Sequence, residues 1–324
     1  RVQDNGTEDG RISVVCTIFP QYDFVRQIAG DRVDLKMLIH PGADVHYYEP
    51  TPQDIIAVSE SDLFIYVGGE SDEWVDNILS SAGESDLEVM SMMECSQKVQ
   101  EETVEGMWDH RDDRHEAAEL SSGGAHGGNG LIVNSERNDS ADVHEAEYDE
   151  HVWTSIDNAI AIVTEIKERL CEMDETNAAY YEQNAAAYIE ELKALKKDFT
   201  DIVQNAQRKT VVFGDRFPLR YFVEEYGLKY YAAFPGCSEQ TEPSASTTAF
   251  LIDTVREKKI PVVFYLELSN EKIADTICES TGAKKMLFHS CHNITKDDFQ
   301  AGVTYLDLMQ NNVEALKEAL EVKQ

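Results

Sequence analysis

The 324-residue sequence has few basic residues, and this shortage limits what it can bind. Lys and Arg total 28 against 62 Asp and Glu, which gives a formal net charge of −34 at pH 7. A surface this acidic repels the phosphates of nucleic acids and the anionic headgroups of lipids. We therefore expect no nucleic-acid partner, and we expect the protein to attract cations.

Long apolar runs and paired cysteines are also missing. No 18 consecutive residues are apolar, so no membrane-spanning helix is expected, and no signal peptide is recognisable. The six cysteines are scattered and form no Cys-x-x-Cys pair. Neither a disulfide framework nor a cysteine-based zinc knuckle is therefore expected. Residues 1–10 are polar and predict a flexible leader.

What the sequence does contain is a repeated alternation of apolar strands and amphipathic helices. Hydrophobic residues make up 42% of the chain, and its length is comfortable for two domains. The expected strands fall at 12–18, 33–39, 62–67, 210–213, 228–234, 261–266 and 285–288. Because helical patterns separate these strands, the fold class we expect is α/β, with two lobes that each hold a mainly parallel sheet.

An uninterrupted helical pattern lies between the two halves. Residues 175–204 place aromatic and apolar side chains at three- and four-residue spacing and contain no Gly or Pro. A helix of about 30 residues is roughly 45 Å long, which is more than packing within one small domain needs. We expect a rigid linking helix at 175–206, between an N-terminal lobe at 11–174 and a C-terminal lobe at 207–324.

An acidic insert interrupts the first lobe. Residues 94–150 contain 16 acidic and 4 basic residues, with a Gly- and Ser-rich centre. This composition predicts a mobile loop. The insert also carries four histidines: His110, His115, His126 and His144. They leave two interpretations open, a plain solvated loop or a weak multivalent trap that raises the local concentration of metal ions.

Three histidines outside the insert lie at the ends of expected elements. His46 lies in the proline-rich loop 41–52, His151 begins a helix after the insert, and His289 directly follows a strand. Ligands of open α/β sheets bind beyond the carboxyl ends of the strands, so facing lobes would bring these imidazoles to one cleft. Three imidazoles with a carboxylate or water suit tetrahedral zinc. A histidine of this kind, taken singly, is more often an ordinary loop residue, and it is their shared position at the ends of elements that favours a metal site.

Two of these histidines stand in distinctive motifs. His46 lies in Asp-Val-His-Tyr-Tyr-Glu-Pro-Thr-Pro (44–52), and His151 lies in Asp-Glu-His-Val-Trp (149–153). Both resemble the paired DPHxYEPTP and DPHVW signatures of the zinc- and manganese-type solute-binding proteins of ABC transporters. The resemblance continues in order as far as 304–309. It implies two lobes joined by a long helix, one metal site in the cleft, and delivery of the ion to a membrane permease. The insert is similar to the mobile loop of the zinc-specific members.

The sequence departs from this family pattern at two ligand positions. Gly214 stands where the family usually has a histidine, and His289 stands where it has an acidic residue after a late strand. We expect the exchanges to compensate and leave a zinc site of His46, His151 and His289. Besides water, three side chains could serve as a fourth or alternative ligand: Asp215, His292 and Glu242. Asp215 could also be a purely structural residue.

The leading interpretation is an extracytoplasmic solute-binding protein that captures Zn²⁺ between its lobes and delivers it to an ABC permease. We expect it to be a monomer in the periplasm or a lipid-anchored protein at the cell surface, with its signal peptide absent from this numbering. Three imidazoles favour zinc over Mn²⁺, because Mn²⁺ prefers more carboxylate oxygen.

Two other interpretations remain open from the sequence. The chain could be a manganese-binding member of the same family or an adhesin, for which the acidic surface is the only support. It could also be a zinc hydrolase with three histidines and a catalytic water. A hydrolase needs a general base near the metal, and no His-Glu-x-x-His motif occurs. We therefore expect a binding protein and not an enzyme.

Overall fold

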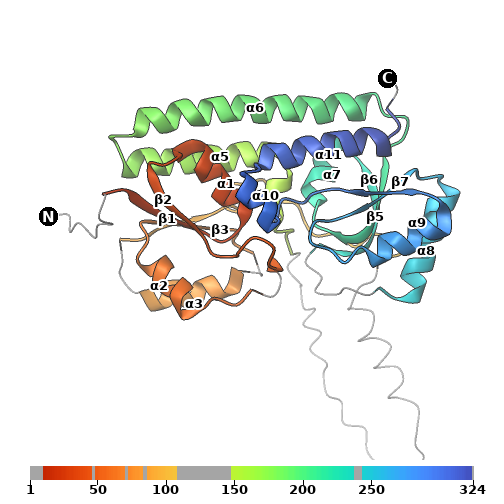
Figure 1. Ribbon diagram of the computed structural model, residues 1–324, viewed down its shortest axis with the longest axis horizontal. Coiled ribbons are helices and arrows are strands. Elements are labelled where there is room, and N and C mark those ends of the chain that lie inside the picture. Colours follow the sequence, from red (N-terminus) through yellow and green to blue (C-terminus); the bar gives the residue numbers. More distant parts are fainter. Residues whose placement is uncertain are drawn as a thin grey trace, which may run out of the picture.

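Two four-stranded sheets form the two lobes of the molecule (Figure 1). The computed structural model describes residues 10–45, 48–69, 72–82, 86–107, 147–236 and 243–322. Every described strand pair is parallel. Parallel neighbours need a crossover connection, and helices supply it in both lobes. The structure confirms the predicted fold class of two α/β lobes with parallel sheets.

The N-terminal sheet has the strand order β2-β1-β3-β4. Its strands are β1 (Ile12–Cys16), β2 (Val33–Met37), β3 (Leu63–Tyr66) and β4 (Glu88–Ser91). The helices of this part are α1 (Phe19–Ala29), α2 (Pro52–Ser59) and α3 (Glu73–Ala82). Side chains alternate along β1, so that Val14 and Cys16 enter the main core while Val15 packs with the residues of α2 and α3 on the other face.

The C-terminal sheet repeats this plan with the order β6-β5-β7-β8. Its strands are β5 (Thr210–Phe217), β6 (Lys229–Pro235), β7 (Val262–Tyr265) and β8 (Lys284–Leu287). Its helices are α7 (Arg220–Tyr226), α8 (Ala245–Glu257) and α9 (Lys272–Thr281). Val211 and Phe213 of β5 face the main core, whereas Val212 between them packs beneath α8 and α9.

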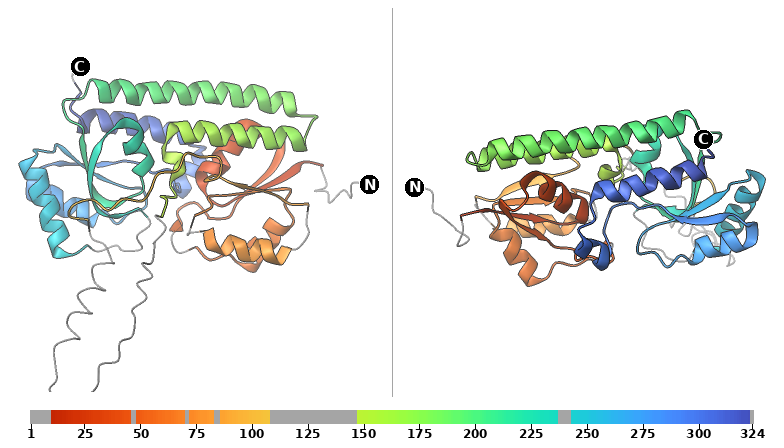
Figure 2. Two further views of the ribbon diagram at one scale, coloured as in Figure 1. Left: turned by 180° about the vertical axis from the view of Figure 1, so that it is seen from behind. Right: turned by 45° about the horizontal axis from the view of Figure 1, so that its top comes forward.

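A layer of long helices covers both lobes from one side (Figures 1 and 2). It consists of α5 (Ile156–Met173), α6 (Ala178–Gln204) and α11 (Tyr305–Ala319). The 27 residues of α6 span roughly 40 Å. Its buried side chains belong to one hydrophobic cluster that also contains residues of both sheets. The lobes therefore share a core, which opposes a wide hinge motion. None of the described helices has both the length and the apolar composition to cross a bilayer.

Two short elements were not predicted, namely β4 and α10 (Lys296–Ala301). The described ends of the acidic stretch contact the rest of the N-terminal part of the chain. Gln100 pairs with Tyr148 in an antiparallel bridge, and Met107 is buried in the main core. These ends are therefore part of the packed fold. The predicted leader lies outside the described residues except for Gly10.

Candidate metal centre

The predicted site residues divide into those that the structure describes and those that it does not. His151, His289, His292 and Asp215 are described. The remaining predicted residues lie outside the described ranges: His46, His110, His115, His126, His144 and Glu242.

A small cavity lies where the two lobes meet at His151 and His292. Its volume is about 20 Å³, enough for one water-sized group. Ile18, Ile39, Val67, Trp74 and Trp153 supply the mostly apolar walls. Val45 and Tyr48, the described residues on either side of 46–47, also line it.

His151 is held by the acidic residue two positions before it. It lies at the start of the short 3-10 helix η3 (Val152–Thr154) and is buried. Its backbone N donates to Asp149 Oδ1 at 2.8 Å, and its Nδ1 lies 3.1 Å from the same oxygen. Because a carboxylate only accepts, Nδ1 carries a proton, and in the neutral ring Nε2 keeps its lone pair.

The pKa of His151 is raised by this surrounding. Burial alone would lower it, but the charge and hydrogen bond of Asp149 act in the opposite direction, and Glu150 and Glu101 add to their effect. The net result is a buried, basic imidazole, which is the kind of nitrogen that binds a divalent metal well.

The imidazole of His292 approaches His151 from the second lobe. The two ring centres are 5.2 Å apart and the rings are nearly perpendicular, at 89°. The His292 ring also contacts Trp153, with ring centres 4.8 Å apart. His292 lies in the segment between β8 and α10. Two sequence-distant elements thus bring their imidazoles together at the cavity.

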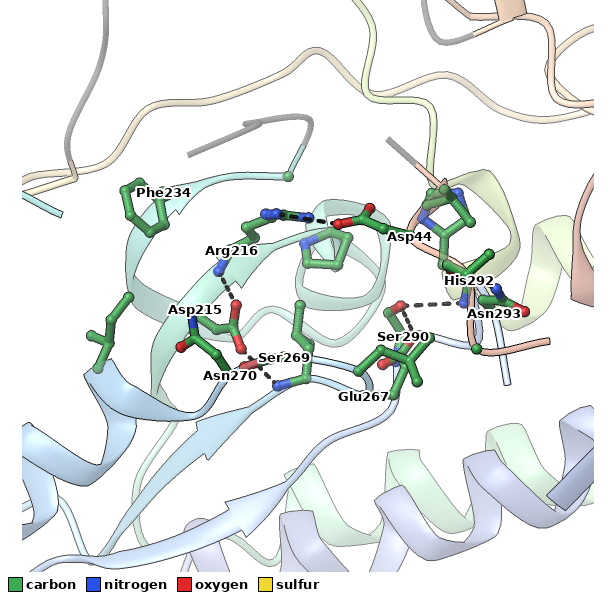
Figure 3. Close-up of a pocket in the computed structure, with 18 of the residues that line it drawn as sticks. Asp44, Asp215, Arg216, Phe234, Glu267, Ser269, Asn270, Ser290, His292 and Asn293 are labelled. Atoms are coloured by element: carbon green, nitrogen blue, oxygen red, sulfur yellow. Dashed lines mark hydrogen bonds and ion pairs between the residues drawn. The ribbon is translucent and has the colours of Figure 1, made fainter. Parts of the chain in front are cut away.

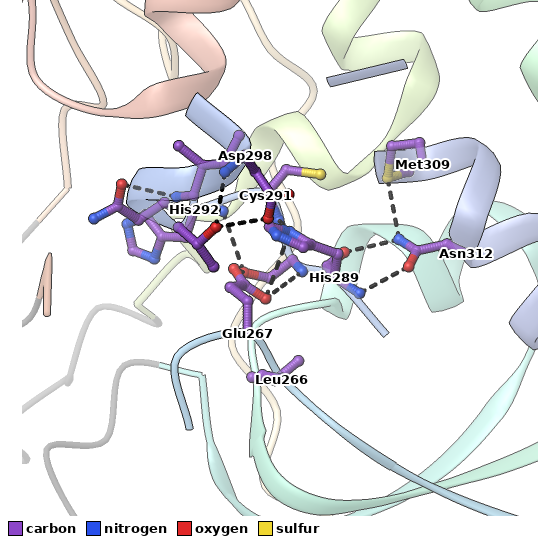
Figure 4. Close-up of polar contacts among 12 residues, drawn as sticks. Leu266, Glu267, His289, Cys291, His292, Asp298, Met309 and Asn312 are labelled. Carbon is purple, nitrogen blue, oxygen red and sulfur yellow. Dashed lines mark hydrogen bonds and ion pairs between the residues drawn. The ribbon is translucent and has the colours of Figure 1, made fainter. Parts of the chain in front are cut away.

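His289 lies in the same segment, but its ring is used inside the second lobe (Figure 4). Its Nδ1 accepts a hydrogen bond from Cys291 N at 2.9 Å, and Asn312 binds its backbone N and O at 2.7 and 2.8 Å. A neutral imidazole that accepts at Nδ1 carries its proton at Nε2, which leaves no lone pair for a metal. His289 lines neither of the two cavities between the lobes. The structure therefore brings His292, and not His289, to His151.

A larger pocket of about 300 Å³ adjoins the small cavity, and His292 and Val45 line both (Figure 3). Asp215 lies in this larger pocket. Its oxygens accept from Arg216 N at 2.8 Å and Leu266 N at 3.1 Å, and burial raises its pKa although these bonds and Ser269 counteract the rise. The carboxylate of Asp215 is thus engaged by the backbone of its own strand, β5, and by the residue that follows β7.

A side chain at Gly214 would collide with α9. A Cβ at this position would lie 2.7 Å from both the backbone N and the Cα of Ala274 in α9. Real Cβ atoms essentially never come so close to backbone atoms. The close packing of α9 on β5 therefore occupies the space that a side chain at Gly214 would need.

Two acidic residues at the small cavity were missed by sequence reasoning. Asp72 and Glu150 both line it. Asp72 Oδ2 accepts from Val67 N at 2.7 Å and Gly68 N at 3.2 Å. Burial raises its pKa to about 6, and the charge of Glu150 adds to the rise against the lowering effect of these bonds. The adjacency of Glu150 to His151 was the only sequence signal for either residue.

Within the described ranges, no three His, Cys, Asp or Glu side chains form a group that could hold a metal ion by itself. The described centre is a pair of imidazoles, with carboxylates behind and beside them.

Comparison with known proteins gives the chain a family. The family described as zinc-uptake complex component A, periplasmic, matches residues 14–319. Zinc-binding lipoprotein AdcA of Streptococcus pneumoniae is 28% identical over 314 residues, which cover 97% of this chain and 56% of AdcA. The high-affinity zinc uptake system protein ZnuA of Bacillus subtilis is 29% identical over 313 residues, which cover 97% of this chain and 89% of that protein.

A solved structure agrees with these relatives. The Zn(II)-bound ZnuA-like domain of Streptococcus pneumoniae AdcA superposes with a TM-score of 0.72 at 26% identity, covering 96% of this chain and 99% of that domain. This chain spans little more than half the length of full AdcA, at 56%. The resemblance predicted from the two histidine motifs is confirmed. Because the match runs through both lobes, the chain belongs to the ZnuA family of zinc-uptake complex components.

Proposed function

We propose that this protein captures Zn²⁺ between its lobes and delivers it to an ABC permease for uptake. The observation that carries the proposal is the pair of imidazoles, His151 and His292, that meet at a cavity of about 20 Å³. The zinc-binding and zinc-uptake names of the relatives point in the same direction.

The spacing of the two rings suits a shared tetrahedral ion. With Zn–N of about 2.0–2.1 Å, two imidazoles on one zinc would place their ring centres roughly 5 Å apart. The ring centres of His151 and His292 are 5.2 Å apart. Little movement of either side chain is then needed on capture.

The surroundings of the pair favour a divalent cation. Asp149 orients His151 and increases its basicity, as carboxylates behind metal-binding histidines do. Asp72 and Glu150 bring negative charge to the cavity wall, and the apolar walls reduce screening by water. Imidazole ligands suit zinc better than Mn²⁺.

We assign three protein ligands to the ion: His46, His151 and His292. His46 is included because Val45 and Tyr48 line the cavity on either side of it in sequence. This set replaces the predicted His289 by His292, which was one of the alternative ligands. A carboxylate of Asp72 or Glu150, the side chain of Glu242, or water would complete the tetrahedron. The four insert histidines remain candidates for an auxiliary trap.

Binding without turnover is the activity that we infer. The cavity that holds the pair has room for a group the size of one water, which suits an ion. The relatives are likewise named for zinc binding and zinc uptake. We place the protein outside the cytoplasmic membrane, since its family is described as periplasmic and AdcA is named a lipoprotein. We infer that it works as a monomer that docks on a permease.

Competition titration of the metal-free protein with Zn²⁺ and a chelator tests this function. We expect one tightly bound equivalent, and a loss of affinity of at least about 100-fold in His292→Ala, since a ligand is removed. His289→Asn is the matched control, because its Oδ1 can take the place of Nδ1 as acceptor for Cys291 N. Absence of tight binding by the wild type would reject the function, and loss in His289→Asn with retention in His292→Ala would reject the ligand set.

A further inference from the structure

The segment that carries His292 crosses from the second lobe to the first. After β8 it passes the cavity and then packs against the N-terminal lobe through α10, where Phe299 lies 5.3 Å from Tyr22 between ring centres. Its backbone is tied to that lobe on the way. Gly42 N donates to Ile294 O at 2.8 Å, and Arg26 donates to Val303 O at 3.0 Å.

Asn293, the neighbour of His292, makes the densest of these ties (Figure 3). Its Nδ2 donates to His40 O at 3.0 Å and to Ala43 O at 2.7 Å, and its Oδ1 accepts from Ile294 N at 2.8 Å. The residue is only 3% exposed. The Nδ2 of one buried amide thus binds two carbonyls of the loop that follows β2, and its Oδ1 binds the backbone N of the next residue in the crossing segment.

Glu267 anchors the same segment to the second lobe, through bonds that do not involve Asn293 (Figure 4). Glu267 accepts from Ser290 N at 2.8 Å and also from its hydroxyl. His292 N donates to Ser290 Oγ at 3.2 Å. If the bonds of Asn293 were lost, Glu267 would still hold the segment on the second lobe. The segment would lose its two bonds to the loop that follows β2.

We propose that Asn293 is a positioning residue for zinc capture. Its amide holds the His292 segment on the loop at His40 and Ala43 and thereby fixes the gap between the imidazoles of His292 and His151. The inference rests on the proposed function. Asparagine suits the task because the two carbonyls need two donors, and its amide supplies both from one side chain. Aspartate would place an acceptor against the carbonyls, and alanine would leave both without their partner.

The test compares Asn293→Ala with Asn158→Ala in the full chain. Asn158 is a matched control, since it is also a buried amide that binds backbone, with Oδ1 accepting from Gln97 N at 2.9 Å and Nδ2 donating to Gln97 O at 3.1 Å. The readouts are the Zn²⁺ dissociation constant, the melting temperature of the metal-free protein, and the visible spectrum of the Co²⁺-loaded protein, which reports the coordination geometry.

We expect Asn293→Ala to weaken Zn²⁺ binding by about 10- to 100-fold, the range for partners that hold metal ligands in place, and to change the Co²⁺ spectrum. Asn158→Ala should lower the melting temperature without either effect. The inference is overturned if Asn293→Ala lowers the melting temperature while its zinc affinity and Co²⁺ spectrum match those of the wild type.

A milder variant keeps the proposal testable if Asn293→Ala does not fold. Asn293→Ser retains a polar group that is too short to reach both carbonyls, and it should shift affinity and spectrum in the same direction. Unchanged affinity and spectrum in Asn293→Ser would overturn the inference. Failure of the proposed function looks different, because wild-type protein and the Asn158→Ala control would then also fail to bind one equivalent of zinc.

Discussion

The indole Nε1 of Trp153 donates a 2.8 Å hydrogen bond to the backbone O of Ser290. This bond joins η3, which follows His151, to the segment between β8 and α10 that carries His292. Both partners are buried, at 1% and 3% exposed. The two imidazoles therefore do not face each other across an open cleft, since their backbones are connected beside the cavity.

The substitution Trp153→Phe should separate the contribution of this hydrogen bond from the contribution of the packed ring. Phenylalanine keeps most of the apolar contact but leaves Ser290 O without its donor, which costs about 1–3 kcal/mol. We expect the metal-free variant to lose about that much stability in urea unfolding. We also expect it to bind zinc about 10-fold more weakly or worse, because the bond no longer holds the elements of His151 and His292 in place for the ion.

Tyr181→Phe is the control for the tryptophan variant. It removes the bond from Tyr181 OH to Asp174 Oδ2 at 2.9 Å, which lies in the helix layer away from the cavity. It should lower stability and leave zinc affinity unchanged. Equal zinc affinities in Trp153→Phe and wild type would show that the indole bond has no part in placing the histidines.

Asp149→Asn should weaken zinc binding without removing a ligand. The amide oxygen can still accept from the backbone N and the Nδ1 of His151, but the negative charge is lost. His151 then becomes a less basic ligand, and we expect a 10- to 100-fold loss of affinity. Isothermal or competition titration at constant pH measures it. An affinity within about twofold of the wild type would contradict the role given to Asp149.

The raised pKa of Asp72 predicts that the stability contributed by this residue falls as pH rises. Its pKa is raised from 3.8 to about 6 in the fold, chiefly by burial. Between about pH 4 and pH 6 the folded state therefore binds more protons at this site than the unfolded state, so its contribution to the free energy of unfolding falls as pH rises. At one pKa unit per 1.36 kcal/mol, the contribution changes by at most about 3 kcal/mol.

The difference between Asp72→Asn and wild type isolates this contribution from those of the other carboxylates. Asparagine can keep the oxygen that accepts from Val67 N and Gly68 N. Unfolding the metal-free proteins in urea at several pH values should show Asp72→Asn gaining stability relative to wild type as pH rises from 4 to 6.5. A difference that is independent of pH, or of opposite sign, would show that the fold does not raise the pKa of this carboxyl.

Much of the fold follows from local sequence patterns. The apolar runs of β1 and β3 and the proline before α2 predict these elements closely, because burial and helix capping act on neighbouring residues. Thr51 caps α2 by accepting from Asp54 N, and Pro52 is the first residue of the helix. The strand β4 was missed, since Glu88–Ser91 is short and its apolar residues do not distinguish it from a loop.

The choice between His289 and His292 could not be made from sequence. The two are three residues apart, and the side that each ring faces depends on the turn between them. Cys291 adopts a left-handed backbone conformation, with φ of 61°, and Asn312 of α11 holds His289 from the far side. Both effects come from tertiary packing. His151 was predicted from its place at the start of a helix and from its motif, and Asp149, which the structure shows to orient it, stands two residues earlier in that motif.

Gly214→His tests whether the ligand pattern usual in the family can be restored. The new Cβ would lie 2.7 Å from backbone atoms of Ala274, so the backbone of β5 or α9 must move. Overpacking of this kind costs about 1–3 kcal/mol. We expect a lower melting temperature and no tighter zinc binding. Gly214→Ala should lose stability in the same way, since it adds the same Cβ without an imidazole. If Gly214→His instead bound zinc more tightly than both Gly214→Ala and wild type, the second lobe would be able to offer a ligand from β5.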